Sequence, residues 1–535
     1  MKSIKKFLAV ILSMTLMLTL GTAAFGAQKT LPSGKDTGSI NVTNLKPGDT
    51  VTAYQFVKAD YNEYGFTGYS AINNYVKDPV APTAQEVIDM ASNAATMTVA
   101  AEKKVATGDT EVTLNGLPVG YYLVMVTSGS ETVYSPMIAG IYYSKSATDN
   151  TLTNGAISAD SDFEIKAQKC WAKSSTPKLE KAIVTPSSKN SKGDDIAIGD
   201  TITFKLSATV PSYSKEYKKV TYKIYDIMSE GLDYVDGSMK CFIEKYENNR
   251  ENIKVTPKVN GGIIEITFDS KFILEHPGQK IQVEYQAKLN EKAGVNFDAN
   301  INKAYLEYSN NPASGSTAKT GEDKVYVYTF GIDSNLFGKS TEKWNEKTKE
   351  LIKVEEGEYQ WVETEKESGI FTTTTALEGA TFTLTNNKTK KSYTATSDKY
   401  GYLKFTGLDA GEYTLQETDA PDGFTLNDAK HTVVITAEYN QDGTLKSYTI
   451  KIDDKATSTY TATYDKGVIK TITSTKDSQG NISESAILKN SKMSFLPSTG
   501  GVGTTIFAIV GVVFVAAALG LHMILRGKSK LEQDR

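Results

Sequence analysis

The chain has 535 residues, with 59 lysines and arginines against 63 aspartates and glutamates, and a formal net charge of −4. This near-neutral balance offers no basic excess for a nucleic-acid backbone, so nucleic acid is not an expected partner. The chain has only three histidines, and it contains no HExxH, no GxSxG, no P-loop and no clustered metal ligands. These absences argue against an enzyme and against a metal or cofactor.

The first 27 residues predict a secretory signal peptide. A lysine-rich start precedes an apolar core from Phe7 to Leu20, and small residues follow up to Ala27. This order is typical of a cleavable export signal, and the apolar core is short for a membrane span. We expect cleavage between Ala24 and Ala27.

The exported part is long enough for roughly three domains of ordinary size. Tyrosine is abundant, at 30 residues, and short runs such as Thr201 to Leu206 alternate between polar and apolar side chains. A period of two indicates β-strands with one buried face. We therefore predict an all-β protein built from tandem β-sandwich domains.

The first predicted domain covers residues 28–166. It begins with a strand-like stretch from Ser39 to Val42, and a more helical interlude runs from about Ala84 to Ala101. A turn and a strong strand follow from Leu117 to Val124, where Gly120 supplies the positive φ that the turn needs.

Two further domains are predicted at residues 167–323 and 324–492. A Lys/Ser/Thr/Pro segment leads into the second domain, and a long charged insertion, residues 339–369, interrupts the third. The pattern Leu-x-x-Gly followed by a tyrosine occurs at Leu117 and again at Leu408, a weak internal repeat that supports tandem modules. The two cysteines, Cys170 and Cys241, either form one disulfide or remain separate thiols, and the sequence does not decide between these.

Residues 493–535 have a distinct order of segments. Leu496, Pro497, Ser498, Thr499 and Gly500 precede an uncharged apolar run from Val502 to Leu525, and a basic tail ends the chain. About 20 apolar residues suffice for a helix to cross a bilayer, so we predict a transmembrane helix with the basic tail in the cytoplasm.

The pentapeptide Leu496–Gly500 resembles the LPxTG sorting signal of Gram-positive surface proteins. The resemblance implies that a sortase, a cysteine transpeptidase, cleaves between Thr499 and Gly500 and passes the threonine carboxyl group to an amine. The chain is then expected outside the cell, anchored to the cell wall.

The segment from Tyr413 to Phe424 resembles the E-box of collagen-adhesin B-type domains, YxLxET-x-APxGY, with phenylalanine in the last place. It implies an immunoglobulin-like sandwich in which a lysine and an asparagine form an intramolecular isopeptide bond promoted by Glu417. Asn490 fits the asparagine of the last strand. The lysine is expected in the first strand, predicted as Tyr326 to Phe337, and Lys339 is the candidate just after it, although the sequence there departs from the family pattern.

The middle domain carries a second set of such signatures. The segment from Pro177 to Ile183 resembles the family's opening strand and places Lys181 as the bonding lysine. The segment from Asn302 to Asn310 resembles the closing strand, with Asn302 as partner, and Asp226 matches the catalytic aspartate. Burial favours the neutral amine of a lysine, which can attack a carboxamide, while a carboxyl group in the same apolar pocket shuttles the proton.

With these signatures the chain resembles a major, or backbone, pilin of the sortase-assembled pili of Gram-positive bacteria. That family carries a pilin motif, often YPKN, whose lysine is the acceptor for polymerisation. Here the segment from Trp171 to Ser174 makes Lys173 the candidate acceptor, with Lys169 as the alternative.

The resemblance implies a structural shaft subunit, joined head to tail through Thr499 of one copy and a lysine of the next. Its implied partners are identical subunits, a class C-type pilus sortase, the housekeeping sortase, minor pilins, peptidoglycan and, where one exists, a host surface ligand. The alternative is a wall-anchored adhesin or a minor or basal pilin that binds host matrix and is not polymerised.

Overall fold

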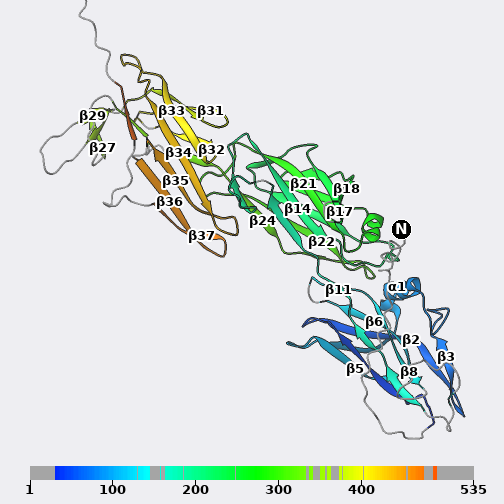
Figure 1. Cartoon of the computed structure of the whole chain (residues 1–535). Helices are drawn as coiled ribbons and strands as arrows, with labels where there is room; N and C mark the ends of the chain where they lie inside the picture. Colours follow the sequence, from blue (N-terminus) through cyan, green and yellow to red (C-terminus); the bar gives the residue numbers. More distant parts are fainter. Residues whose placement is uncertain are drawn as a thin grey trace, which may run out of the picture.

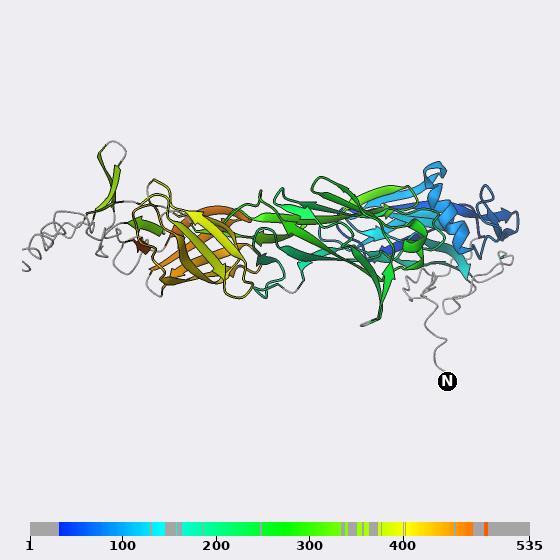
Figure 2. The same ribbon diagram turned by 90° about the horizontal axis from the view of Figure 1, so that it is seen from above.

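In a computed structural model, the strands of the chain gather into three bodies that follow one another in a row (Figure 1). Seen from above, the row is elongated, with the first and third bodies at opposite ends (Figure 2). The structure describes residues 31–490 apart from residues 129–130, 145–156, 158–162, 185, 247–248, 333–336, 341–349, 356–357, 363–372, 376, 400, 402, 454–455 and 475–485. The predicted signal peptide and the whole of residues 493–535 lie outside the described residues. Within the described part, no helix is long and apolar enough to span a membrane.

The first body packs two sheets around an aliphatic core that includes Ile40, Val124 and Ile141. One sheet has the order β3-β2-β6-β8-β9, with β4 also paired to β2, and the other has the order β10-β1-β5. Gly120 begins β6 with a φ of +153°, and a Cβ atom there would lie 2.2 Å from the carbonyl oxygen of Val57, so only glycine fits this turn. The strands are β1 (Thr37–Thr43), β2 (Thr50–Asn62), β3 (Gly65–Ala71), β4 (Val99–Lys104), β5 (Glu111–Pro118), β6 (Gly120–Thr127), β7 (Val133–Tyr134), β8 (Met137–Ser144), β9 (Glu164–Ala167), β10 (Lys169–Trp171) and β11 (Ser174–Ser175).

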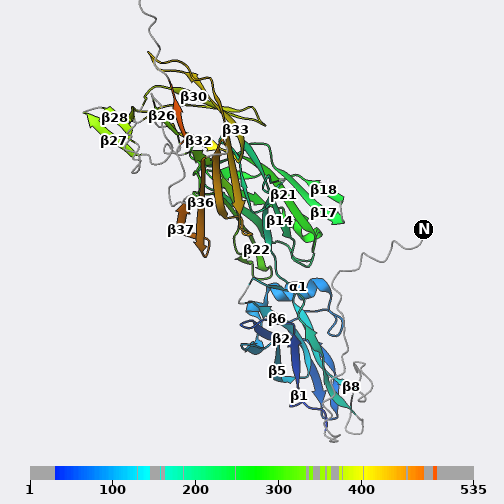
Figure 3. The same ribbon diagram turned by 60° about the vertical axis from the view of Figure 1, so that its left-hand side comes forward.

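Helix α1 (Ala84–Ser92) lies at the end of this body that faces the middle body (Figure 3). A capping box begins it, because Thr83 accepts a hydrogen bond from the backbone of Glu86 and Glu86 accepts one from the backbone of Thr83. The helix ends at Ser92 and β4 begins at Val99, so the helical part is shorter than the predicted interlude of residues 84–101.

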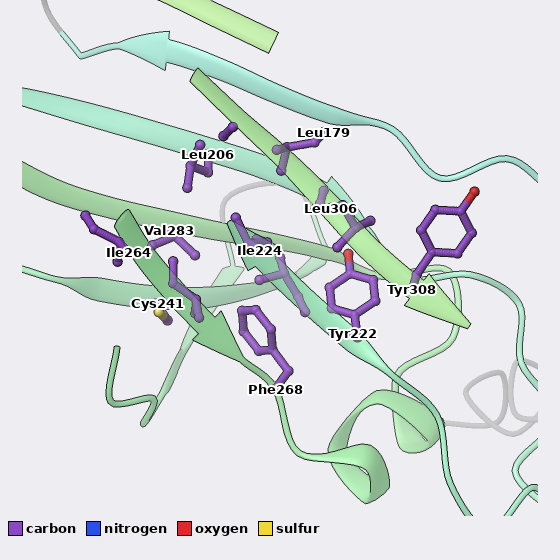
Figure 4. Packing of buried hydrophobic residues seen from close by; sticks show 14 of the residues in the cluster. Leu179, Leu206, Tyr222, Ile224, Cys241, Ile264, Phe268, Val283, Leu306 and Tyr308 are labelled. Atoms are coloured by element: carbon purple, nitrogen blue, oxygen red, sulfur yellow. The ribbon is translucent and has the colours of Figure 1, made fainter. Parts of the chain in front are cut away.

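The middle body is a sandwich of two large sheets. One has the order β12-β14-β21-β17-β18, with β16 paired to β21, and the other has the order β13-β24-β22-β15-β20-β19, with β23 paired to β22. Their inward side chains meet in one core, to which Leu206 of one sheet and Leu306 of the other belong (Figure 4). The elements are β12 (Leu179–Ile183), β13 (Gly193–Asp195), β14 (Thr201–Thr209), β15 (Tyr222–Met228), β16 (Leu232–Tyr234), β17 (Lys240–Tyr246), β18 (Asn249–Ile253), β19 (Lys258–Asn260), β20 (Ile263–Thr267), α2 (Ser270–Glu275), β21 (Lys280–Leu289), β22 (Asn300–Asn311), β23 (Ser316–Lys319) and β24 (Asp323–Tyr328).

The third body is built on a sheet of order β31-β30-β33-β34-β35-β36-β37, accompanied by the short pairs β25-β32 and β26-β38 and by the small sheet β27-β28-β29. Its core includes Phe382, Leu415 and Ile435. The strands are β25 (Phe330–Ile332), β26 (Phe337–Ser340), β27 (Glu350–Glu355), β28 (Glu358–Val362), β29 (Thr373–Thr375), β30 (Thr381–Asn386), β31 (Ser392–Thr396), β32 (Phe405–Leu408), β33 (Gly411–Asp419), β34 (Lys430–Tyr439), β35 (Leu445–Ile452), β36 (Ala456–Asp465), β37 (Val468–Ser474) and β38 (Ala486–Lys489). The prediction of an all-β chain of tandem sandwiches is confirmed.

The strand pairing divides the chain a few residues later than the sequence suggested. β10 and β11 pair with β1 and β7 of the first body, beyond the predicted boundary at residue 166. β24 pairs with β22 and β13 of the middle body, beyond the predicted boundary at residue 323. The segment predicted as the opening strand of the third body, Tyr326 to Phe337, is therefore divided between two bodies.

The middle and third bodies touch closely. A Cβ atom at Gly193 would lie 2.3 Å from the carbonyl oxygen of Gly443, so the two backbones are in contact. Lys391 of the third body donates hydrogen bonds to Asp200 and to the carbonyl of Ile198 in the middle body, at 3.0 and 2.6 Å. These contacts show a packed joint between the two bodies.

The two cysteines lie in different bodies, Cys170 in β10 and Cys241 in β17, and both are free thiols. Each is buried, and burial raises the pKa of each thiol to about 12. The structure thus favours separate thiols, one of the two alternatives that the sequence left open.

Candidate functional site: buried lysine, carboxylate and asparagine groups

Lys181 occupies an inward position of the middle sandwich. The side chains of β12 alternate, so that Leu179, Lys181 and Ile183 are buried while Glu180 is exposed. The side chain of Lys181 is completely buried, with a relative exposure of 0%. A strand with period two thus carries a lysine at a position where an aliphatic residue is usual.

Asp226 and Asn302 face Lys181 from the opposite sheet. In β15 every second residue is buried, including Asp226, and in β22 the same alternation buries Asn302. The antiparallel register pairs Asp226 with Ala304 and Met228 with Asn302, so the two polar side chains are neighbours on the same face of the sheet. The three residues that the sequence singled out in this body therefore come together in its core.

A fourth residue, Tyr285 of β21, joins the group. Its hydroxyl donates to Oδ1 of Asp226 at 2.7 Å and accepts a hydrogen bond from Nδ2 of Asn302 at 2.7 Å. Nζ of Lys181 donates to Oδ2 of Asp226 and, at 3.2 Å, to the same tyrosine hydroxyl. Sequence reasoning did not find Tyr285, because the only signal was its inward place in an ordinary alternating strand.

The surroundings of this group are apolar. Nζ of Lys181 lies 5.0 Å from the ring centre of Phe204 and 5.4 Å from that of Tyr285. Burial lowers the pKa of Lys181, and the charge of Asp226 opposes that shift. Oδ1 of Asn302 is buried and has no hydrogen-bond partner among the described residues. The lowered pKa favours a neutral lysine amine, the form that can act as a nucleophile.

The backbone of Lys181 is fixed from the edge of the sandwich. Its amide nitrogen donates to Oδ2 of Asp323 at 2.7 Å, and its carbonyl oxygen accepts from Nζ of Lys192 at 2.6 Å. Lys192 and Asp323 are themselves an ion pair at 2.6 Å. The main chain on both sides of the buried lysine is thereby held in place.

In the third body, Glu417 and Asn490 are in direct contact. Glu417 takes an inward position in β33 and is 2% exposed, as is Asn490 just after β38. Nδ2 of Asn490 donates to Oε1 of Glu417 at 2.9 Å, and the backbone nitrogen of Asn427 donates to Oε2 at 2.8 Å. Oδ1 of Asn490 has no hydrogen-bond partner within the described part of the chain. The E-box glutamate and the asparagine of the last strand are thus brought together.

Lys339 is placed by its backbone only. It lies in β26, which pairs in parallel with β38, and its register partner is Leu488, two residues before Asn490. The side chain of Lys339 lies outside the described part of the structure.

The two candidate acceptor lysines lie on the surface of the first body. Lys169 begins β10 and Lys173 lies between β10 and β11, and both are exposed. Trp171, between them, is 70% exposed. The backbone carbonyl of Lys173 accepts a hydrogen bond from Ser135 at 3.0 Å, which ties this segment to the first body. The donor motif Leu496–Gly500 lies outside the described residues.

Three family models match the chain. They are a T6 antigen Ig-like domain at residues 35–174, a prealbumin-like fold domain named SpaA at residues 360–453, and the LPXTG cell wall anchor motif at residues 489–530. A curated relative, the trypsin-resistant surface T6 protein of Streptococcus pyogenes serotype M6, is 26% identical over 549 residues, which cover 93% of this chain and 96% of that protein.

Two solved structures align with the chain. The T6 backbone pilin of serotype M6 Streptococcus pyogenes, described as modular with three domains, aligns with a TM-score of 0.58 and 20% identity over 86% of this chain and all of that chain. The full-length major pilin SpaD of Corynebacterium diphtheriae aligns with a TM-score of 0.48 and 16% identity over 88% of this chain and all of that chain. The T6 backbone pilin thus shares the fold.

Proposed function

We propose that this chain is a cell wall-anchored backbone pilin that is polymerised covalently and reinforced by internal isopeptide bonds. The family models and the T6 relative support the pilin part of this proposal. A sortase cleaves after Thr499 and holds its carbonyl as an acyl enzyme. Lys173 of the next subunit then attacks this carbonyl. Because donor and acceptor lie on different parts of each copy, the contact is head to tail and does not close, which yields a fibre.

The internal bonds are proposed at Lys181–Asn302 and at Lys339–Asn490. In the middle body Lys181 passes one proton to Asp226, and its neutral amine attacks Cγ of Asn302. The Nζ–Cγ bond forms, the Cγ–Nδ2 bond breaks, and a second proton of Nζ leaves with Nδ2 as ammonia. In the third body Glu417 takes the place of Asp226. Proximity in the folded core supplies much of the rate.

The observation that carries the internal chemistry is the complete burial of Lys181 beside Asp226 and Asn302. An isolated buried ammonium group is costly, and amide formation would remove that charge permanently. A pilus sortase of the class C type, a housekeeping sortase, minor pilins and peptidoglycan are the further partners that this proposal requires.

One experiment tests the internal bonds. The intact mass of the purified folded ectodomain is expected to fall short of the sequence mass by one ammonia for each bond, and tandem mass spectrometry should identify branched peptides that contain Lys181 with Asn302 and Lys339 with Asn490. A mass equal to that of the sequence would refute the cross-links.

A second experiment tests polymerisation. In cells that express the pilus sortase, Lys173→Ala is expected to replace the high-mass ladder of wall extracts by monomer. Lys169→Ala is the matched control, since Lys169 is also exposed and lies in the same segment, and it should keep the ladder. A ladder that persists in Lys173→Ala and disappears in Lys169→Ala would move the acceptor to Lys169. Persistence in both variants would exclude this segment.

A further inference from the structure

We propose that the hydroxyl of Tyr285 is a catalytic group of the middle body, which relays the proton from Lys181 to the departing amide nitrogen of Asn302. The inference rests on the proposed isopeptide chemistry and goes beyond it, because it assigns a role to a residue outside the lysine, carboxylate and asparagine triad.

The hydroxyl oxygen of Tyr285 contacts all three other groups of the site. Oη of Tyr285 lies 2.7 Å from Nδ2 of Asn302 and 3.2 Å from Nζ of Lys181, so it touches both the leaving nitrogen and the attacking nitrogen. It also lies 2.7 Å from Oδ1 of Asp226. A hydroxyl group has one proton to donate and two lone pairs to accept, and these three contacts use all of them.

The two carboxylate sites differ in how the carboxylate is connected to the asparagine. In the third body Glu417 contacts the amide nitrogen of Asn490 directly, at 2.9 Å. In the middle body the described hydrogen bonds connect Asp226 to Asn302 only through Tyr285. Aspartate is one methylene shorter than glutamate, and the tyrosine hydroxyl spans the remaining distance.

A relay through the tyrosine hydroxyl balances in protons and charge. After Lys181 has given one proton to Asp226, its neutral amine bonds to Cγ of Asn302 and becomes cationic. Oη of Tyr285 accepts a proton from Nζ and gives its own proton to Nδ2, so the phenol ends as it began. Nδ2 leaves as ammonia, and one hydrogen stays on the new amide. Burial raises the pKa of Tyr285 well above its usual value, which keeps the hydroxyl protonated and able to serve as donor.

The ring of Tyr285 is fixed by its neighbours, so its hydroxyl can be removed without disturbing the packing. Its centre lies 5.6 Å from that of Phe204 and 5.9 Å from that of Tyr234. Tyr285→Phe keeps these ring contacts. Tyr234→Phe is the matched control, because it removes a hydroxyl from the adjacent ring, and within the described residues that hydroxyl makes no hydrogen bond to Lys181, Asp226 or Asn302.

The test follows bond formation after cell-free synthesis of the ectodomain, with samples quenched in acid denaturant and the Lys181–Asn302 branched peptide quantified by mass spectrometry. In Tyr285→Phe the rate is expected to fall by about 10²-fold or more, the range typical of a lost acid–base group. The Lys339–Asn490 bond of the same molecules should form at the wild-type rate. Tyr234→Phe should behave as wild type.

A double variant, Tyr285→Phe with Asp226→Glu, separates relay from packing. The longer carboxylate is expected to reach Nδ2 directly, as Glu417 does, and to restore part of the rate. An unchanged rate in Tyr285→Phe, or loss in both the single and the double variant, would overturn the relay. Absence of the bond in the wild-type middle body would instead refute the proposed cross-link itself.

Discussion

At the scale of single residues, the buried Lys181 sets the energetics of the middle body. Its ammonium group is tolerated before bonding because Asp226 contacts it, and its pKa is lowered by burial. Removing one partner of a buried ion pair leaves an uncompensated charge, which costs about 3–5 kcal/mol. Removing both partners leaves no charge in the core and avoids this cost.

Two variants that both prevent the bond are therefore expected to differ in stability. Asp226→Ala leaves Lys181 buried without its carboxylate, and it is expected to destabilise the ectodomain by about 3–5 kcal/mol more than the double variant Lys181→Met with Asp226→Ala, which leaves neither charge in the core. Thermal or denaturant unfolding of the two proteins measures the difference. Equal stability would mean that Lys181 is not charged in the unbonded core.

Both thiols should be unreactive in the folded protein. With the pKa of Cys170 and of Cys241 raised to about 12, only about 10⁻⁴ of each is thiolate at pH 8, and the thiolate is the reactive form. Alkylation with iodoacetamide at pH 8 is therefore expected to be slow in the native ectodomain and fast after unfolding. Rapid labelling of both residues in the native state would show that these thiols are accessible and ionised.

The residues of the candidate site differ in how far the sequence predicted them. Lys181, Asp226, Asn302, Glu417 and Asn490 stand in segments whose patterns are long enough to recognise, and the structure brings them together in two groups. Tyr285 stands in Lys280–Leu289, an alternating strand in which nothing separates it from a core tyrosine. Its role depends on a hydroxyl contact between two sheets, which no spacing along one strand encodes.

At the scale of elements, strand existence was easier to predict than strand partnership. Alternation from Thr201 onward correctly indicated β14, and the turn at Gly120 correctly indicated β6. The segment Asp323–Tyr328 also alternates, but alternation does not say which sheet receives a strand. Its parallel pairing with β13, which joins residues far apart in sequence, places β24 in the middle body.

The joint between the middle and third bodies contains a buried carboxyl group. Asp195 of β13 is 7% exposed, and it accepts hydrogen bonds from the backbone of Ala410 and, at 2.6 Å, from the hydroxyl of Tyr439. Burial raises the pKa of Asp195 to about 6, the charges of Asp194 and Asp409 add to the rise, and the two hydrogen bonds oppose it.

This shift predicts a pH-dependent stability. The folded state binds a proton more tightly than the unfolded chain, whose aspartate titrates near 3.8, so the contribution of Asp195 to stability is fully present below pH 3.8 and is lost as the pH rises to about 6. The full loss is on the order of 3 kcal/mol.

Asp195→Asn is the matched variant, because its amide can still accept from Ala410 and donate to Tyr439. The wild-type ectodomain is expected to lose more stability than this variant between pH 4.5 and pH 7, as measured by thermal unfolding. Identical pH profiles of the two proteins would contradict the assignment.

At the scale of the whole molecule, the row of three bodies determines which part of each subunit carries tension in a fibre (Figure 2). In the proposed polymer, force enters each subunit at Lys173, which lies between β10 and β11, the last two strands of the first body. It leaves at Thr499, which follows the third body in the sequence. Strands β1–β10 of the first body precede Lys173 in the chain and therefore lie outside this path. With both cross-links formed, the covalent path runs from Lys173 to Lys181, crosses to Asn302, continues to Lys339 and crosses again to Asn490.

The segments between the bonded residues then carry no load. A single-molecule pull on wild-type polymer is expected to show no unfolding step from the middle body, because residues 182–301 are bypassed by the Lys181–Asn302 bond. In Lys181→Met polymer the same residues become part of the path, and each subunit that unfolds should add roughly 400 Å of length at about 3.5 Å per residue. Wild-type polymer that shows this step would place the middle-body bond outside the path of the force. Lys181→Met polymer that does not lengthen would show that the load is carried elsewhere, and a different acceptor than Lys173 would then be required.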